Sequence, residues 1–125
     1  MFTIIARWTI AHGREAAART ALIRLAKQVR TKEPDTLLYL VFVPDMKQLS
    51  LPTASPLEVV FVEGYKNRAA FLAHLNGPVF TQFTAKHRAL FLSTTVMGLD
   101  GKPVQSPFVL LQNLRRLGGF VRQAF

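Results

Sequence analysis

Seven consecutive apolar residues, Leu37–Val43 (LLYLVFV), constrain the fold of this chain more than any other segment. Their β-branched and aromatic side chains favour a strand. A strand of an antiparallel sheet normally alternates apolar and polar residues, because one face of the sheet meets water. This segment does not alternate, and neither does Val59–Val62. Both faces of the sheet are therefore expected to be covered.

The order of the predicted elements is typical of an α+β fold of the ferredoxin-like kind. Strand, helix, strand, strand, helix, strand is the split βαβ arrangement, a four-stranded antiparallel sheet with helices on one face. Asn67 is the expected N-cap of the second helix. The predicted strands are 2–10, 37–43, 58–65 and 91–99, and the predicted helices are 14–30, 67–76 and 79–90.

The helices of this fold cover one face, so the other face needs a different cover. Burying a large apolar side chain is worth about 1.5–3 kcal/mol, so an exposed second face would be costly. A second copy of the same sheet is the expected cover, which predicts a homodimer. The alternative is that the C-terminal tail folds over this face.

The chain divides into a domain at residues 1–99 and a C-terminal extension at residues 100–125, expected to pack on the partner subunit. Its basic stretch, Asn113–Arg122, is predicted to be a helix end that embraces the partner. The alternative role for this stretch is to attract an anionic substrate.

Composition narrows the functional classes. The 125 residues include no cysteine, which removes disulfides, thiolate catalysis and thiolate-bound metals. No apolar run is long enough to span a bilayer, and the N-terminus lacks the order of a signal peptide, so we expect a cytoplasmic protein without a membrane partner. The net charge of +9 raises nucleic acid as a partner. No RNA-recognition strand motif occurs, so no nucleic-acid partner is expected.

Three segments together resemble the antibiotic biosynthesis monooxygenase (ABM) family. They are IIARWTIAHGRE, EPDTLLYLVFV and VVFVEGYKNRAAFLAHLNGPVF, and the tail LLQNLRRLGGFVR also resembles that of some members. The resemblance covers about residues 2–98. The most specific residues are Tyr65, Ala70, Phe71, His74, Pro78 and Phe80.

The resemblance implies a dimeric α+β barrel that oxidises a quinol, an anthrone or a similar electron-rich aromatic molecule with O₂. It implies that no metal, flavin or haem cofactor is needed. A fold does not fix a reaction, so the other hypothesis is a non-catalytic dimer that binds a small ligand or serves in a stress response.

Oxygenation without a cofactor requires a base near neutral pH, an apolar pocket and a group that stabilises the substrate anion. His74 and His87 titrate in the right range and lie on predicted helices among Phe71, Phe80 and Phe83. His74 is the candidate catalytic base. The candidate substrate-binding residues are Trp8, Tyr65, Phe71, Phe80, Phe83, His87 and Arg7, with Arg88 as an alternative cation.

Each candidate also has a structural interpretation. The histidines are alternatively packing residues with satisfied ring nitrogens, and the aromatic residues are alternatively core. Glu63 lies in an apolar strand, where an unpaired carboxylate is costly. A cross-strand ion pair with Arg7 is the expected solution.

The sequence lacks the residues that binding of haem, a metal ion or a phosphate-containing cofactor would require. Relatives that degrade haem carry Asn, Trp and His where this chain has Ala6, His74 and Thr84. His87, one turn later, is the only nearby substitute for the haem ligand. No His-x-x-x-His pair or carboxylate cluster predicts a metal site, and no Gly-rich phosphate loop is present.

Overall fold

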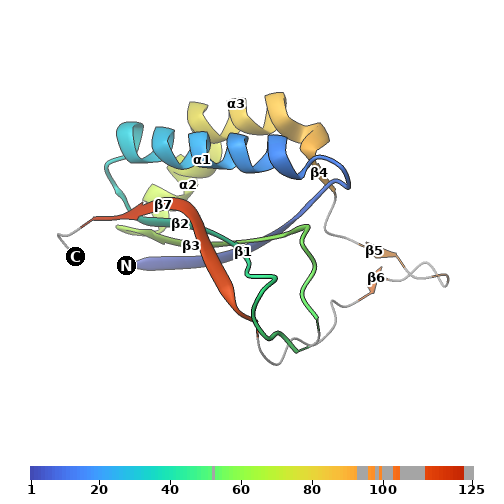
Figure 1. The fold of residues 1–125 in the computed structure, drawn as a ribbon. Coiled ribbons are helices and arrows are strands. Elements are labelled where there is room, and N and C mark those ends of the chain that lie inside the picture. The colour runs from blue at the N-terminus through green and yellow to red at the C-terminus, as the bar shows by residue number, and fades with distance from the viewer. Residues whose placement is uncertain (52, 93–95, 98, 100–102, 105–111, 123–125) are drawn as a thin grey trace.

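The chain forms an α+β sandwich of one sheet and one layer of helices, all on the same face of the sheet (Figure 1). The computed structural model describes residues 1–51, 53–92, 96–97, 99, 103–104 and 112–122. The main sheet has five antiparallel strands in the order β4-β1-β3-β2-β7. This architecture confirms the predicted ferredoxin-like fold class. The elements are β1 (Phe2–Ile10), α1 (Glu15–Lys32), β2 (Thr36–Pro44), β3 (Glu58–Tyr65), α2 (Arg68–Asn76), α3 (Pro78–His87), η1 (Arg88–Leu90), β4 (Phe91–Leu92), β5 (Val96–Met97), β6 (Pro103–Val104) and β7 (Leu114–Val121).

The helices form where local sequence favours them. The face of α1 that packs on the sheet is buried and has helical spacing. It consists of Ala18, Ala21, Leu22, Leu25, Ala26 and Val29. Asn67 caps α2 as expected, because its side chain accepts a hydrogen bond from the backbone N–H of Ala70 at 2.9 Å. No helix within the described residues is long and apolar enough to cross a membrane.

The second face of the sheet is apolar, as the lack of alternation predicted. Tyr39, Val41 and Val43 are buried in the core beneath the helices. The intervening residues of β2 point to the opposite face. There, Leu40 pairs with Val62 of β3, which in turn pairs with Ile5 of β1, a residue 68% exposed. We call this surface the open face.

The basic stretch of the C-terminal extension is not the predicted helix end. Leu114–Val121 is not a helix end but β7, an antiparallel strand paired with β2 of the same sheet. Within the described residues the tail therefore extends the edge of the sheet, and Gln112, just before β7, donates a hydrogen bond of 2.9 Å to Glu58 on the open face. The division at residue 99 does not separate two structural units, because β7 completes the sheet of the first.

The fourth predicted strand, 91–99, is described only in part. Phe91–Leu92, as β4, pairs with β1. Val96–Met97, as β5, pairs instead with β6 in a separate two-stranded sheet. Residues 93–95 and 98 lie outside the described residues. The last part of the helix predicted at 79–90 is the 3₁₀ turn η1.

A glycine allows β7 to dock against β2. The register between these strands shifts between Val41 and Phe42, which bends β7. Gly119 has a φ of +110°, and a Cβ at this position would overlap the carbonyl oxygen of Tyr39. Only glycine fits this close approach without strain.

Gly119→Ala should therefore destabilise the sheet edge. The positive φ and the steric overlap together predict a loss of at least about 2 kcal/mol in the free energy of unfolding, measured by urea denaturation. Gly118→Ala is the matched control, because a Cβ there would make only an ordinary contact of 3.6 Å with Ile23. Equal stabilities of the two variants would contradict this account of the docking.

Candidate active site

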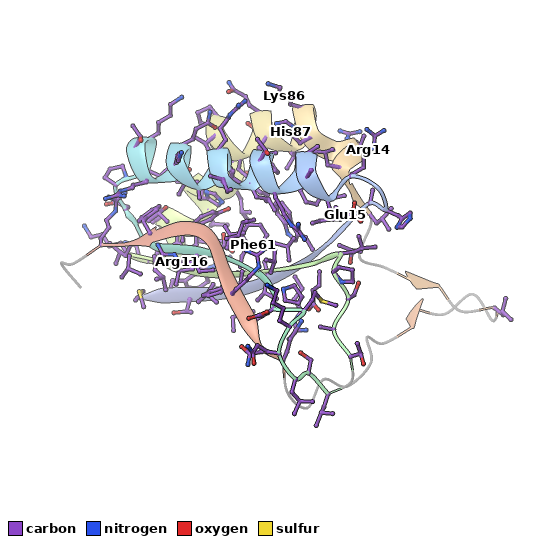
Figure 2. All side chains as sticks on the ribbon, viewed as in Figure 1. Arg14, Glu15, Phe61, Lys86, His87 and Arg116 are labelled. Carbon is purple, nitrogen blue, oxygen red and sulfur yellow. The ribbon has the colours of Figure 1, made fainter. Side chains whose placement is uncertain are left out.

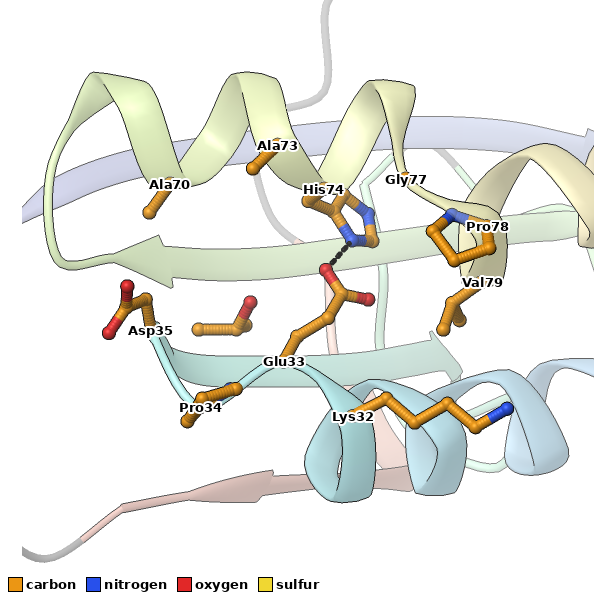
Figure 3. Close-up of a pocket in the computed structure, with 11 residues that line it drawn as sticks. Lys32, Glu33, Pro34, Asp35, Ala70, Ala73, His74, Gly77, Pro78 and Val79 are labelled. Carbon is orange, nitrogen blue, oxygen red and sulfur yellow. Dashed lines mark hydrogen bonds and ion pairs between the residues drawn. The ribbon is translucent and has the colours of Figure 1, made fainter.

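A cavity of about 290 Å³ opens between the C-terminal end of α1 and the helices α2 and α3 (Figure 3). Small and ring-shaped side chains leave this space unfilled, since α2 presents Ala70 and Ala73 and the α2–α3 junction supplies Gly77 and Pro78. The complete lining is Lys32, Glu33, Pro34, Asp35, Thr36, Ala70, Ala73, His74, Gly77, Pro78 and Val79. The wall is thus largely apolar, with Glu33 and His74 as its innermost polar pair. We call it the His74 cavity.

His74 lies between two carboxylates. Its Nδ1 is 2.7 Å from Glu33 Oε1, and its Nε2 is 3.9 Å from Glu63 Oε1. The side chain is almost fully buried, whereas that of Glu33 is 18% exposed. An ionised carboxylate only accepts hydrogen bonds, so the short contact requires a proton on Nδ1. Nε2 then carries a proton only in the imidazolium form, and that proton would face Glu63.

A buried hydrogen bond extends this cluster beneath α2. The Tyr65 hydroxyl donates to Glu63 Oε1 at 2.9 Å, and both residues are buried in β3. The expected cross-strand pair of Glu63 with Arg7 is wrong. Arg7 instead donates to Glu58 at 3.1 Å on the open face, because neighbouring residues of a strand point to opposite faces.

Burial shifts the pKa of Glu63 and of two neighbouring tyrosines. It raises the pKa of Glu63, an effect that the hydrogen bond from Tyr65 and the charge of His74 partly oppose. Burial also raises the pKa of Tyr65, and the nearby charge of Glu63 adds to this shift. The pKa of Tyr39 is raised for the same reasons, so both phenols stay neutral.

One oxygen of Glu33 lacks a partner. Oε1 contacts His74, while Oε2 is shielded from bulk water and has no hydrogen-bond partner among the described residues. Figure 3 shows this second oxygen pointing toward the side of the cavity where Pro78 and Val79 lie. A carboxylate oxygen without a partner in an apolar wall is a strong acceptor for an incoming donor.

Aromatic rings separate the His74 cavity from a second one. Phe80 lies 5.1 Å from the His74 ring and 6.1 Å from Trp8, between centroids. Trp8 in turn packs on Phe61 at 4.5 Å, and Figure 2 shows Phe61 between the helices and the sheet. The space between the helices and the sheet is therefore closed in its middle and open at both ends.

The second cavity, which we call the aromatic cavity, has a volume of about 350 Å³. Its lining is Trp8, Phe83, Thr84, His87, Arg88, Phe91 and Leu92. His87 stands at the outer side of the helix layer beside Lys86 (Figure 2). Partial burial, with smaller contributions from the charges of Lys86 and Arg24, lowers the pKa of His87.

The structure divides the predicted site residues among several places. His74 lines one cavity, and Trp8, Phe83 and His87 line the other. Tyr65 lies within the cluster around His74. Phe71 packs on the Tyr65 ring, with ring centroids 5.3 Å apart. Arg7 lies away from both cavities on the open face.

Glu33 is the polar residue that the sequence analysis missed. It stands in Glu33-Pro34-Asp35, which indicates only the end of a helix. Its partner His74 is 41 residues away in the sequence. Neither segment therefore carries a local signal that would predict this contact.

Within the described part of the chain, no group of three or more His, Asp or Glu side chains is placed to hold a metal ion. The carboxylates of Glu33 and Glu63 face different nitrogens of His74, so their oxygens do not converge on one point.

The fold and the buried His–carboxylate cluster define a ferredoxin-like α+β protein with a polar centre beneath its helices. The model of the antibiotic biosynthesis monooxygenase family matches residues 1–86, so the chain belongs to this family. A Deinococcus radiodurans crystal structure, provisionally described as an antibiotic biosynthesis monooxygenase, superposes with a TM-score of 0.60 at 26% identity. The match covers 74% of this chain and 84% of that one. A search of curated proteins found no match.

The raised pKa of Glu63 predicts how stability varies with pH. The folded protein holds this proton more tightly than the unfolded chain, whose carboxyl titrates near its ordinary value of 4.5. As pH rises from about 4.5 toward the raised pKa, the unfolded chain loses its proton first, so the free energy of unfolding falls. Glu63→Gln removes this titration and keeps an acceptor for Tyr65. The variant should gain stability relative to the parent across this window, measured by urea denaturation.

Tyr65→Phe is the companion variant. It removes the hydrogen bond that lowers the pKa of Glu63, so the decline of stability should extend to higher pH. A constant difference in stability between Glu63→Gln and the parent, at pH values on both sides of 4.5, would contradict the assignment.

Proposed function

We propose that this protein is a cofactor-independent monooxygenase that oxidises a quinol, an anthrone or a similar electron-rich aromatic molecule with O₂. Family membership supports an oxygenase. The single observation that carries the proposal is the contact of the buried His74 with the partly exposed Glu33, 2.7 Å long and beside a largely apolar cavity. A base in a largely apolar wall can take the proton of a bound hydroxyl, which this chemistry requires.

The substrate lies in the His74 cavity with its hydroxyl toward Glu33. A small rotation of the Glu33 side chain, which is 18% exposed, brings Oε2 to the phenolic hydroxyl. The hydroxyl donates to this oxygen, while the ring packs on Ala70, Ala73 and Val79. Oε1 remains hydrogen-bonded to His74. A proton that passes from the substrate to Glu33 therefore changes the charge of the Glu33–His74 pair.

The protein then favours the substrate anion, which reacts with O₂ itself. For an anthrone, the anion transfers one electron to O₂, and the resulting radical and superoxide combine to form a C–O bond. Protonation gives a hydroperoxide. Cleavage of its O–O bond with loss of the remaining C–H proton leaves a ketone, and the second oxygen atom departs as water. One CH₂ group and one O₂ thus become one C=O group and one H₂O.

The other predicted residues have supporting roles in this proposal. Tyr65 and Glu63 hold the far side of the His74 ring, and Phe71 and Phe80 exclude water from it. Trp8, Phe83 and His87 surround the aromatic cavity, where an electron-rich ring also finds stacking partners. Arg7 has no place in the binding site.

A non-catalytic ligand-binding protein is the second candidate function. The observation that favours it is that each ring nitrogen of His74 already faces a carboxylate of the protein. A histidine satisfied in this way is also suited to a structural role.

Oxygen uptake tests the enzymatic proposal. Purified protein should consume O₂ when given a hydroquinone or an anthrone, and His74→Ala should lower kcat/KM by about 10²–10⁴-fold. Glu33→Gln keeps the shape but not the charge, and should lower it by at least about 10-fold. His12→Ala, at an exposed position that lines neither cavity, is the control and should retain most of the activity, and His87→Ala probes the aromatic cavity.

Two outcomes would overturn parts of this proposal. If the parent consumes no O₂ with any substrate of the panel but binds the same compounds, the ligand-binding function replaces the enzymatic one. If His87→Ala loses activity and His74→Ala does not, the reaction belongs to the aromatic cavity.

We also propose that the protein is a homodimer in which the open faces of two copies pack together. Ile5, Leu40 and Val62 form an apolar row across three strands of this face. In the single chain Ile5 is 68% exposed, and Leu40 and Val62 are partly exposed. Pairing with the same face of a second copy would bury this row on both sides.

Ile5→Glu should disrupt this dimer. Ile5 is 68% exposed in the single chain, so the substitution should leave folding of the subunit intact while placing a carboxylate in the interface. We expect the parent to sediment as a dimer and the variant to dissociate at micromolar concentration. Thr20→Glu, on the exposed side of α1, is the control and should remain dimeric. A monomeric parent would refute the arrangement.

A further inference from the structure

Arg122, at the end of β7, binds the turn that carries Glu33. Its Nε donates to the carbonyl of Thr36 at 2.8 Å, and its Nη2 donates to the carbonyls of Arg30 at 2.8 Å and Glu33 at 3.3 Å. The guanidinium also lies 4.7 Å from the centre of the Phe120 ring. One side chain therefore joins the last strand to the end of α1 and the start of β2.

These contacts lie where the backbone needs donors. The last carbonyls of a helix have no partner within the helix, and a cation is favourable at this end. α1 ends at Lys32, and Glu33 is its C-cap residue. The turn is also held by its own bond from Thr36 N–H to the Glu33 carbonyl at 3.0 Å. Arg122 adds donors to the same turn from outside, and its own backbone N–H donates to Leu37 at 2.9 Å.

The turn held by Arg122 forms one wall of the His74 cavity. Residues 32–36 line it, and Glu33 extends from this wall to His74 Nδ1. A hydrogen bond of 2.7 Å between a carboxylate and an imidazole is sensitive to small displacements of either backbone. The wall on the other side, α2, has its own cap at Asn67.

We infer that Arg122 is a positioning residue for the site: by binding the Arg30, Glu33 and Thr36 carbonyls it holds the Glu33 carboxylate against His74. The family match ends at residue 86, so this support comes from a part of the chain outside the matched segment. The C-terminal strand is thus a component of the site. The effect on turnover rests on the proposed function, whereas the effect on the Glu33–His74 contact does not.

Arginine is suited to this role because its planar guanidinium presents several donors in fixed directions. Lysine offers a single ammonium and cannot reproduce the separate contacts of Nε and Nη2. Arg122→Lys should therefore restore only part of what Arg122→Ala loses. Arg116→Ala is the matched control on the same strand, because Arg116 donates to the carbonyl of Gly119 within β7 at 2.6 Å.

The first measurement is independent of activity. The chain has three histidines, so the ring N–H signals are resolvable by ¹⁵N-edited NMR. The parent should show a downfield Nδ1–H signal of His74 that is protected from exchange with water. This signal should be lost in Arg122→Ala, be weakened in Arg122→Lys and persist in Arg116→Ala. If Arg122→Ala is too unstable to measure, an unchanged signal in Arg122→Lys overturns the inference.

The second measurement is a double-mutant cycle on O₂ uptake. Arg122→Ala should lower kcat by at least about 10-fold, since a displacement of a catalytic group by about 1 Å has effects up to 10²-fold. Combined with Glu33→Gln it should cause little additional loss, because both act through one carboxylate. Fully additive losses would show that Arg122 acts elsewhere. An inactive parent whose NMR signal still depends on Arg122 would reject the proposed function and keep the positioning role.

Discussion

The structure depends on a sheet in which the strand β2 carries apolar side chains on both faces. On one face, Tyr39, Val41 and Val43 are buried under α1, but this burial alone does not fix the register of β2. If β2 shifted by one residue, the apolar side chains on its two faces would exchange places, and no polar side chain of Leu37–Val43 would become exposed. Register must therefore come from elsewhere, and the shapes of the side chains and the close approach of Gly119 to Tyr39 supply it. The C-terminal strand thus secures the register of the sheet as well as the wall of the cavity.

The same sheet explains why the helix layer contains two cavities. Large rings fill the middle of the interface, where Trp8, Phe61 and Phe80 pack together, and the ends receive smaller side chains. At one end, Ala70 and Ala73 leave a space that polar groups from α1 and α2 enter. At the other end the walls are aromatic, and His87 and Arg88 stand at the rim. The two cavities therefore offer different chemistry. The His74 cavity contains a buried proton acceptor, and the aromatic cavity is an apolar space beside cationic side chains.

Most of the fold was predictable because its signals are local. The alanine-rich face of α1, the cap at Asn67 and the apolar strand β2 each depend on neighbouring residues. The strand β7 was not predictable, because Gly118 and Gly119 weaken its strand propensity and its pairing with β2 is remote in sequence. His74 was found through the family pattern. Its partner Glu33 was missed because a contact across 41 residues leaves no trace in either segment.

The buried charges around His74 are difficult to explain by stability alone. Glu33 and Glu63 approach one imidazole in an environment where burial raises the pKa of Glu63. Apolar side chains of similar volume would commonly make such a core equally or more stable. Tyr65 satisfies one carboxylate oxygen, yet Glu33 Oε2 has no partner among the described residues. A partly satisfied polar cluster beside a cavity is typical of a site in which the missing partner is a ligand. In the proposed reaction a phenolic hydroxyl would be that partner, since a phenol supplies both the donor and an apolar ring for the wall.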